Sequence, residues 1–471
     1  MSGKKVVVLG GGITGLATAE KLCEKGFDVT VIEKNDYVGG ISTSFKHKGY
    51  WLDFGPHKIY TQMPHIQSEF ERIIGKKNLL DIPKRSRVRL LGKYYNFPVG
   101  LKDMLLGMNP LVGLRCGMYY GITLLSSVVR KKEDVSYEDY LVNRFGRGIF
   151  DLVFGQYAKK VWGEPSELSA ELARTRVAIP SLLVMLKNMI IGNKGDPKVS
   201  ADVFHYPKSG IKELPENLSK NIMKKNGKIL FQSEPIEIIT KDRNMKQVKI
   251  RQKNTTLALD ADYCISTIPL CETAKLLRPK ATKEVIKHAD SLKYRSLILL
   301  YVVVDKNRLF DDNWIFYPEE EFIFNRLSEQ KGFSESMIPK GKTVLCVEIT
   351  VDNSDPLLKA GDKKIFERAI KDLEKADIIK KKEAIDFFTV VLKDIYPIYG
   401  LDFREHVDSV LGHIDEVEGL ITNGRPGLFN YNNMDHCLDM GFIAASHVIS
   451  GKKNVDWVKT RRKFDEYRIV D

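Results

Sequence analysis

The stretch KVVVLGGGITG, residues 5–15, decides the fold of this chain. It begins with a short β-branched run typical of a buried parallel strand and leads directly into a GxGxxG turn. Helical spacing of apolar residues follows over 16–25, Gly26 ends that helix, and residues 28–33 (DVTVIE) form a second apolar strand ending in an acid. Strand, glycines, helix, strand and acid in register within about 30 residues predict a Rossmann βαβ unit that binds a dinucleotide.

Each part of the glycine turn has a physical role in binding a pyrophosphate. Gly10 permits the tight turn, Gly12 lets the backbone approach the phosphates, and Gly15 allows helix and strand to pack closely. The helix begins at about Ile13 and Thr14, where backbone N–H groups without a helical partner can donate to phosphate oxygens. We therefore predict that these five residues contact the cofactor.

The acid at the end of the second strand and the residues after it indicate which dinucleotide the site binds. Glu33 is placed to accept hydrogen bonds from ribose hydroxyls, and its carboxylate would repel a 2′-phosphate. Lys34 follows, and the Gly39-Gly40 pair resembles the second diphosphate contact of glutathione-reductase-like FAD enzymes. Simple NAD dehydrogenases lack this pair. The segment predicts FAD, and because nothing in the sequence marks a covalent tether, we expect it to be bound noncovalently.

The charge of the whole chain favours anionic partners. Its 471 residues include 74 Lys and Arg against 61 Asp and Glu, which gives a net charge of +13. These charges are dispersed in short runs such as Arg130–Lys132, and no nucleic-acid motif accompanies them. We therefore expect a small anionic ligand or acidic lipid, and no nucleic acid. The length suggests two or three lobes, and the oligomeric state stays open.

The cysteines and the start of the chain indicate a compartment. The six cysteines lie far apart, without a CxxC or other metal-type spacing, so we expect reduced thiols and no metal site. Residues 1–5 run directly into the first strand, which gives no sign of a signal peptide. A cytoplasmic location is the expectation.

The most apolar stretch, Met104 to Val129, has two interpretations. Pro110 and Arg115 interrupt it, so it is a poor candidate for a bilayer span. It is consistent with a pair of core helices, and also with a monotopic face that makes peripheral contact with a membrane. The sequence leaves both open.

Blocks along the rest of the chain carry a family resemblance. The block DFGPH (53–57) is similar to a strand that brings a glycine step against the flavin ring, and KVWGEP (160–165), followed by ELSAE and Arg174 or Arg176, resembles K-W-G-x-P-x-E-L-x-A-E-x-x-x-R. Three more blocks are NRLSEQKGF (325–333), DIYPI (394–398) and GRPGLFNYNNMD (424–435). Together they resemble the amine oxidase and protoporphyrinogen oxidase superfamily, and within it UDP-galactopyranose mutase.

The resemblance implies roles for individual residues. Its catalytic candidates are Arg326, Arg425, Tyr431, Tyr396 and His57. Its substrate-binding candidates are Trp162, Arg176, Arg326, Tyr396, Arg425 and Tyr431, with arginines as anion clamps and tyrosines as hydroxyl donors. Ile236, Asn433 and Met434 join the cofactor-binding set. Structural alternatives stay open: a core tryptophan, salt-bridged arginines, a strand-packing tyrosine and a satisfied histidine.

The chain also departs from the mutase pattern. Phe429 and Asn433 stand where that pattern has Tyr and Asp, and the segment 435–445 is more similar to the closing helix of oxidases and desaturases. These differences leave flavin binding in place but open the question of the substrate. An apolar, lipid-linked substrate and a nucleotide sugar are both compatible with the sequence.

The predicted architecture is α/β with a discontinuous Rossmann-like FAD-binding domain of the glutathione-reductase-like type. This domain comprises residues 1–65, 222–275 and 418–471. Residues 66–221 are expected to form a helical lobe and residues 276–417 a mixed α+β substrate lobe, with strands at 297–304 and 344–351 and helices at 363–376 and 382–388.

Two reactions fit this site. The preferred one is net dehydrogenation, in which an FAD-dependent oxidoreductase acts through flavin N5 on a phosphate-bearing or lipid-linked substrate. The alternative is a mutase-like isomerisation of a sugar nucleotide that uses reduced FAD. The oxidase-like closing helix and the additional apolar segment favour the first, whereas the arginine and tyrosine blocks favour the second.

Overall fold

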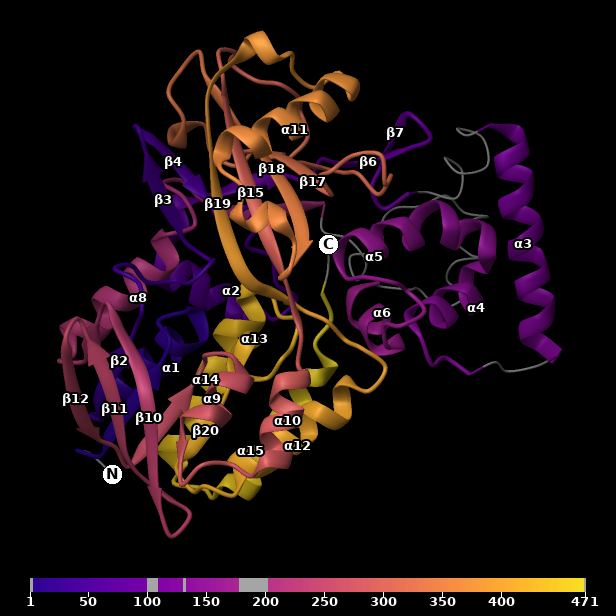
Figure 1. Ribbon diagram of the computed structural model, residues 1–471. Helices are drawn as coiled ribbons and strands as arrows, with labels where there is room; N and C mark the ends of the chain where they lie inside the picture. The colour runs from indigo at the N-terminus through magenta and orange to yellow at the C-terminus, as the bar shows by residue number, and fades with distance from the viewer. Residues whose placement is uncertain (1–2, 100–108, 130–132, 178–201, 470–471) are drawn as a thin grey trace.

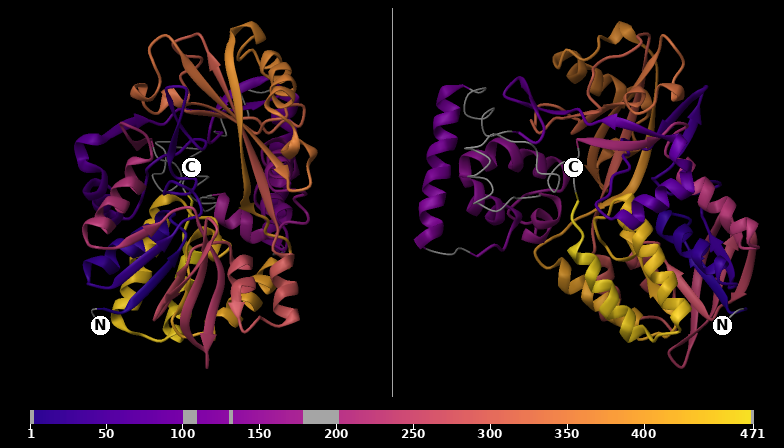
Figure 2. Two further views of the ribbon diagram at one scale, coloured as in Figure 1. Left: turned by 60° about the vertical axis from the view of Figure 1, so that its left-hand side comes forward. Right: turned by 180° about the vertical axis from the view of Figure 1, so that it is seen from behind.

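The computed structural model describes residues 3–99, 109–129, 133–177 and 202–469. Figures 1 and 2 show three parts: a sheet with packed helices near the N-terminus, a second sheet with α11 (Asp362–Lys375) against it, and a group of helices beside both. Segments from both ends and the middle of the chain meet in the first part.

The first part is built on a five-stranded parallel sheet. Its strand order is β20 (Leu420–Thr422), β13 (Tyr263–Ser266), β1 (Lys5–Leu9), β2 (Asp28–Ile32) and β9 (Lys228–Leu230). The β1 segment is buried from Val6 to Leu9, which explains its continuous apolar run. Helices α1 (Ile13–Glu24), α8 (Glu213–Lys224) and α14 (Met434–Ser450) pack together beside this sheet. The predicted βαβ unit therefore lies at the centre of a Rossmann-like α/β fold.

A smaller sheet extends from the middle segment of the chain. Its order is β12 (Thr255–Asp260), β11 (Asn244–Gln252), β10 (Ser233–Lys241) and β14 (Leu277–Arg278). Strands β11 and β12 form the expected antiparallel hairpin. Two short antiparallel pairs are β3 (Ser44–His47) with β4 (Tyr50–Asp53), and β5 (Leu79–Pro83) with β8 (Val203–Pro207).

The second large sheet has seven strands. Its order is β19 (Ala384–Pro397), β15 (Tyr294–Val304), β18 (Thr343–Asp352), β17 (Arg326–Glu329), β16 (Trp314–Phe316), β6 (Ser86–Leu90) and β7 (Lys93–Asn96). Every residue of β15 is buried. The hairpin β6–β7 comes from the range 66–221, so that range supplies strands as well as the predicted helices.

The predicted helix at 382–388 is wrong. Only a single 3₁₀ turn, Lys381–Glu383, is present, and residues 384–397 form β19 antiparallel to β15. The β-branched and aromatic residues from Ile385 to Val391 suit a pleated strand, and pairing with the fully buried β15 outweighs their local helical spacing.

The apolar segment contains one helix in its described part, not a pair of core helices. Helix α3 (Pro110–Val129) lies against α4 (Tyr137–Ile149) at the outer edge of the molecule (Figures 1 and 2). Cys116 and Tyr120 are buried toward α4, whereas five large apolar side chains on the other face are exposed: Leu111, Leu114, Met118, Ile122 and Leu125. Residues 104–108 of the predicted segment lie outside the described residues.

The remaining helices complete the connections between these layers. They are α2 (Pro64–Phe70), α5 (Gln156–Val161), α6 (Ala170–Arg176), α9 (Leu270–Leu276), α10 (Lys283–Ser291), α12 (Phe403–Asp415), α13 (Gly424–Gly427) and α15 (Asn454–Arg461). Short π-helical turns at Glu71–Gly75 and Phe150–Gly155 continue α2 and α4. None of the described helices is both long enough and apolar enough to cross a bilayer.

Candidate functional site

A cavity of about 850 Å³, here called the main cavity, opens between the five-stranded sheet, the seven-stranded sheet and the helices of residues 137–177. Such a volume is typical of small-molecule and cofactor sites. Its walls come from segments that are far apart in the sequence, from Gly10 to Cys437.

The β1–α1 turn has the geometry that a diphosphate contact requires. Gly10 has a φ of +99°, and a Cβ at Gly15 would lie 2.1 Å from the Gly10 carbonyl oxygen, so both positions require glycine. Gly12 lines the main cavity, and a Cβ added there would meet no protein atom within 4 Å. Gly12 is also the N-cap of α1 and provides no side-chain cap. Backbone N–H groups at the start of α1 are therefore free of a side-chain partner at the cavity wall.

Glu33 lies at the end of β2 with its carboxylate at the cavity. Its Oε2 accepts from the Gly11 N–H at 2.8 Å, and its Oε1 accepts from the backbone and side-chain N–H groups of Asn35 at 2.9 and 2.8 Å. A carboxylate offers about four lone-pair positions. These three bonds fix the side chain and leave acceptor capacity for a ribose hydroxyl.

The second glycine pair lies directly beside the first turn. The Gly39 N–H donates to the Gly11 carbonyl at 2.7 Å, and Gly39 and Gly40 have φ values of +102° and +60°. Both line the main cavity. The loop thereby brings a second stretch of side-chain-free backbone to the same place, as a diphosphate site requires.

The Gly55 turn is held from behind by a buried polar cluster. Asp53 accepts hydrogen bonds from the hydroxyls of Ser44 and Tyr206, and its carbonyl accepts from Tyr301 at 2.6 Å. Burial raises the pKa of Asp53 to about 6. Gly55 has a φ of +86°, so this step requires glycine, and the residues on either side of it, Phe54 and Pro56, line the main cavity.

His57 lies in the cavity wall beside this turn. Its Nδ1 is 3.2 Å from the Gly55 carbonyl oxygen. Burial, aided by the positive charges of Arg326 and Arg425, lowers the pKa of His57 to about 4, although the contact with Gly55 opposes this shift. The imidazole is therefore neutral near pH 7.

Two arginines converge on the Tyr431 ring. The guanidinium carbons of Arg425 and Arg176 lie 4.9 and 5.4 Å from the centre of the Tyr431 ring, and Arg176 also lies 5.7 Å from the Trp162 ring. Among the described residues, neither guanidinium has a carboxylate within the 4.0 Å that defines an ion pair. The buried Nε of Arg176 and Nε1 of Trp162 have no hydrogen-bond partner there either. The two guanidiniums and the indole N–H thus form a positively charged group of donors that suits an anion.

Tyr431 supports these arginines and is not part of the cavity wall. Its hydroxyl donates to the Pro397 carbonyl at 2.8 Å, and the ring is buried beneath Arg425. It is absent from the residues that line the main cavity, whereas Tyr396 lines it. This placement corrects the expectation that Tyr431 itself offers a hydroxyl to a ligand in the cavity.

Arg326 is not a free anion clamp. Its Nε and Nη2 donate to Oε1 and Oε2 of Glu348 at 2.5 and 2.8 Å, and Glu348 is fully buried. Both residues line the main cavity, directly opposite each other in the β17–β18 register. Because the carboxylate neutralises the guanidinium, the expected role of Arg326 in holding an anion needs revision.

The rest of the cavity wall is largely apolar. Helical segments contribute Tyr137, Val153, Phe154, Tyr157, Val161 and Trp162, and strand segments contribute Val88, Phe97, Leu297, Trp314 and Phe316. A dinucleotide groove and an apolar chamber thus share one cavity. The apolar chamber can hold a hydrophobic group.

Most of the predicted site residues meet at this cavity. Those in its wall are Gly10, Gly12, Ile13, Thr14, Glu33, Lys34, Gly39, Gly40, His57, Trp162, Arg176, Arg326, Tyr396, Arg425, Asn433 and Met434. Gly15 lies behind the turn, and Ile236 lies just beyond the lining residues Ser233–Pro235.

Sequence reasoning missed several residues of the wall, among them Tyr157, Thr267, Trp314, Asn325 and Glu348. Two of these residues could have been recognised from the sequence. Glu348 is the only charged residue in the predicted strand 344–351, and Thr267 lies directly after β13, within the segment 222–275 predicted for the FAD-binding domain.

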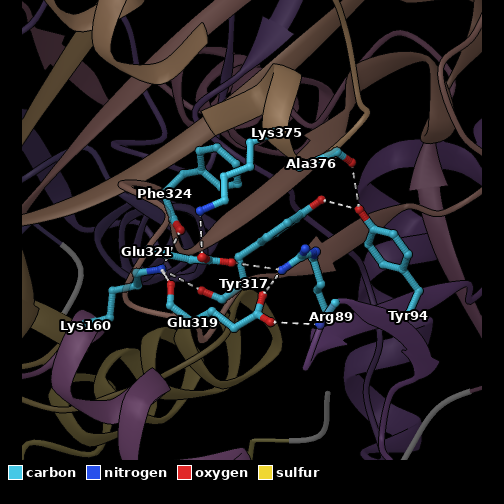
Figure 3. A network of polar contacts seen from close by, with 10 residues as sticks. Arg89, Tyr94, Lys160, Tyr317, Glu319, Glu321, Phe324, Lys375 and Ala376 are labelled. Atoms are coloured by element: carbon cyan, nitrogen blue, oxygen red, sulfur yellow. Dashed lines mark hydrogen bonds and ion pairs between the residues drawn. The ribbon is translucent and has the colours of Figure 1, made fainter. Parts of the chain in front are cut away.

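A partly buried lysine joins the helical and sheet walls of the cavity (Figure 3). The Lys160 ammonium donates to the carbonyls of Tyr317, Glu319 and Phe324 at 2.8, 2.7 and 2.9 Å. In the same network the Glu319 carboxylate pairs with Arg89. All three ammonium donors are used, so α5 is fixed to the loop that precedes Arg326. Trp162 and Arg326 are positioned by this connection.

Replacing Lys160 by methionine should destabilise the protein by on the order of 3 kcal/mol, because three inward-facing carbonyls lose their donors. The adjacent Lys159→Met is a matched control, since the Lys159 side chain is exposed and forms a surface ion pair with Glu320 at 3.2 Å. We expect that control to stay within about 0.5 kcal/mol of the unsubstituted protein. Denaturant unfolding of the FAD-loaded variants measures both values, and equal stability of the two would contradict this assignment.

Comparison with known proteins agrees with this geometry. The family model described as "Flavin containing amine oxidoreductase" matches residues 13–394. A zeta-carotene-forming phytoene desaturase of Myxococcus xanthus is 24% identical over 392 residues, which cover 75% of this chain and 73% of that protein. A 4,4'-diapophytoene desaturase of Staphylococcus aureus (strain COL) is 23% identical over 430 residues, covering 80% and 83%.

The fold is also similar to that of solved structures. The crystal structure of reduced UDP-galactopyranose mutase superimposes with a TM-score of 0.81 at 20% identity, covering 96% of this chain and 95% of that one. At this level of identity the likeness shows the fold alone. The flavin of the matched family is a cofactor that the glycine turn, Glu33 and the Gly39-Gly40 pair of this chain fit.

Proposed function

The chain belongs to the flavin containing amine oxidoreductase family, and we propose that it oxidises a substrate with an apolar body and an anionic group. The cofactor is FAD, and we propose that it is held noncovalently. One observation carries the substrate proposal: the main cavity combines an apolar chamber with two arginines that have no ion pair among the described residues. The desaturases to which the chain is similar are named for apolar polyene substrates, which supports the apolar body.

The residues of the cavity divide the work of binding. Arg176 and Arg425 hold the anionic group, with Tyr431 stacked against both and Trp162 beside Arg176. When bound, FAD supplies a two-electron acceptor at N5. The backbone at Gly55 lies where a flat ring could approach closely, and the apolar walls exclude water from the substrate.

The remaining polar groups orient the substrate. Tyr396 is partly buried, and desolvation raises the pKa of its hydroxyl, so it is a neutral donor and acceptor. His57 is neutral as well. In this proposal Glu348 holds Arg326 in place and keeps one end of the chamber close to electrically neutral. Of the five catalytic candidates named from the sequence, one is an anion-binding arginine that acts with Arg176, one is a hydroxyl, one is a neutral imidazole and two are positioning residues: Arg425, Tyr396, His57, Arg326 and Tyr431, respectively.

A sugar-nucleotide isomerase that uses reduced FAD is the second candidate. Trp162 and the paired arginines could bind a nucleotide diphosphate, and the fold is that of a UDP-galactopyranose mutase. Phe429 weighs against it, because this residue, which replaces a tyrosine of the mutase pattern, is buried against Tyr294 and Tyr399 and lies outside the cavity wall.

Flavin absorbance separates the two reactions. Oxidised enzyme mixed without oxygen with polyene precursors or isoprenoid phosphates should bleach once and stop until an electron acceptor is added. Enzyme reduced with dithionite should not interconvert UDP-hexopyranose and UDP-hexofuranose. Sustained interconversion by the reduced enzyme, without net oxidation, would establish the isomerase and overturn the preferred reaction.

A hydrophobic substrate suggests work at a membrane surface, and α3 supports this part of the proposal. Its five exposed apolar side chains are 55–75% accessible and follow one helix face, from Leu111 to Leu125. Arg115 is the only charged residue of α3, and the basic run Arg130–Lys132 follows it in the sequence. An apolar helix face next to basic residues suits an anionic lipid interface.

The double substitution Leu114→Ser and Leu125→Ser should weaken binding to anionic vesicles by roughly tenfold or more, because each leucine contributes on the order of 1.5–3 kcal/mol when buried. Leu401→Ser with Val455→Ser is the matched control, since both residues are exposed elsewhere. Vesicle flotation at low and high salt measures the effect. If all protein stays in solution at low salt, α3 does not bind lipid.

A further inference from the structure

A second cavity lies apart from the residues of the main cavity. Its volume is about 490 Å³, within the usual range for small-molecule sites. Four chain segments form it: residues 80–85, which comprise most of β5 and the start of the β5–β6 connection, the residue after β8, the β15–β16 connection (308–313) and residues 331–336. Asn313 links the β15–β16 connection to two of the other segments. Its Oδ1 accepts from the Arg85 N–H, and its Nδ2 donates to the Gly332 carbonyl.

The charges around this second cavity are unbalanced. Four cations line it, Arg85, Lys208, Arg308 and Lys331, against two carboxylates, Asp311 and Glu335, which leaves an excess of two positive charges. Within the described part of the chain, none of these six side chains has an ion-pair partner within 4.0 Å. The cations are therefore available to an external anion.

Lys331 is the most informative of the four. It is only 6% exposed, and its ammonium donates to the Asn307 Oδ1 at 2.7 Å and the Lys342 carbonyl at 3.1 Å. Both acceptors are neutral, and an ammonium has three donors. A buried cation without a counter-charge is costly, so an anion beside it would be stabilising.

Arg308 lies next to this lysine. A Cβ on Gly332 would be 3.5 Å from the Arg308 Nη2, so the guanidinium lies over the turn that follows Lys331. Its Nε donates to the Phe310 carbonyl at 2.9 Å. The buried Glu329 carboxylate is close enough to interact electrostatically with Arg308 but forms no ion pair with it. This carboxylate accepts hydrogen bonds from two backbone N–H groups and from the Thr343 hydroxyl.

The backbone that carries the other cations is fixed as well. The hydroxyls of Ser334 and Ser336 donate to the Lys208 carbonyl at 2.7 and 2.6 Å. The Arg85 backbone is bonded to Asn313 at 2.7 Å. The positions from which the cations extend are thus set before any ligand binds, which lowers the entropic cost of binding.

We propose that the second cavity binds a small phosphate-bearing molecule, with the phosphate between Arg308, Lys331 and the two outer cations. Leu80, Ile82 and Phe333 line the same cavity and provide an apolar surface for the rest of the ligand. The Phe333 ring stacks on Trp314, with centres 6.3 Å apart, and Trp314 lines the main cavity. A ligand here would contact the reverse side of the main-cavity wall. This inference does not depend on the proposed reaction.

Calorimetric titration of the FAD-loaded protein with inorganic pyrophosphate tests the proposal. Arg308→Gln and the double substitution Arg85→Ala/Lys208→Ala should each weaken binding by roughly tenfold or more, as expected for lost charge-assisted bonds. The control Lys253→Ala/Lys452→Ala removes two exposed charges elsewhere and should leave the affinity unchanged. Equal flavin content in all variants verifies that they are folded.

The Arg425→Ala variant identifies the site of binding. Pyrophosphate in the second cavity should bind this variant as it binds the unsubstituted protein. The proposal is overturned if binding depends on Arg425 and not on Arg308, because the anion then occupies the main cavity. Absence of binding at millimolar pyrophosphate would overturn it as well.

Discussion

Gly12→Ala is expected to fold normally and to lose most of its affinity for FAD. A Cβ at Gly12 meets no protein atom within 4 Å, so nothing in the chain opposes the methyl group. The same methyl would point into the main cavity where the backbone must approach the diphosphate. Losing two charge-assisted hydrogen bonds, each contributing about 1.5–3 kcal/mol, would weaken FAD binding on the order of 100-fold or more.

Two other glycines serve as references for this prediction. Gly15→Ala places its Cβ 2.1 Å from the Gly10 carbonyl oxygen, so it should damage the fold and FAD binding together. Gly412→Ala, in the open on α12, should change neither. Fluorescence titration with FAD and circular dichroism measure the two properties. Unchanged FAD affinity in Gly12→Ala would place the diphosphate elsewhere.

Arg425→Ala should lose substrate turnover while it keeps FAD. The guanidinium has no ion pair in the described structure, and its contacts to the carbonyls of Asn432 and Ile395 are both 3.3 Å long. It is therefore free to hold an anion in a water-poor cavity. We expect a loss of about 2–4 kcal/mol of transition-state stabilisation in kcat/KM.

The control for Arg425 is Arg243→Ala, an exposed arginine on the β10–β11 turn. It should leave kcat/KM unchanged, and the flavin-to-protein ratio should be the same in both variants. The assay uses the substrate that bleaches the oxidised flavin. Full activity of Arg425→Ala would remove this residue from the site and leave Arg176 as the only unpaired arginine on the Tyr431 ring.

Local sequence was sufficient for the dinucleotide site. The positions of Gly10, Gly12, Gly15 and Glu33 follow from one continuous βαβ unit, in which strand, turn and helix are each decided by neighbouring residues. The FAD prediction rested on Gly39-Gly40, which lies against the same turn. A motif confined to some 35 residues needs no knowledge of distant contacts.

Long-range pairing explains what the sequence could not predict. Arg326 and Glu348 are brought together by the β17–β18 register, so a residue expected to bind an anion has a buried counter-charge instead. Strand β19 was mistaken for a helix in its first part because β15, more than 80 residues earlier, supplies its pairing partner. The exposed face of α3 likewise depends on which face α4 covers.

The central claim is that the main cavity holds noncovalent FAD in a redox enzyme, and the absorption spectrum of the purified protein tests it most directly. We predict a yellow protein with oxidised-flavin maxima, from which acid or heat releases one FAD per chain. A colourless protein that cannot be reconstituted with FAD would contradict this account.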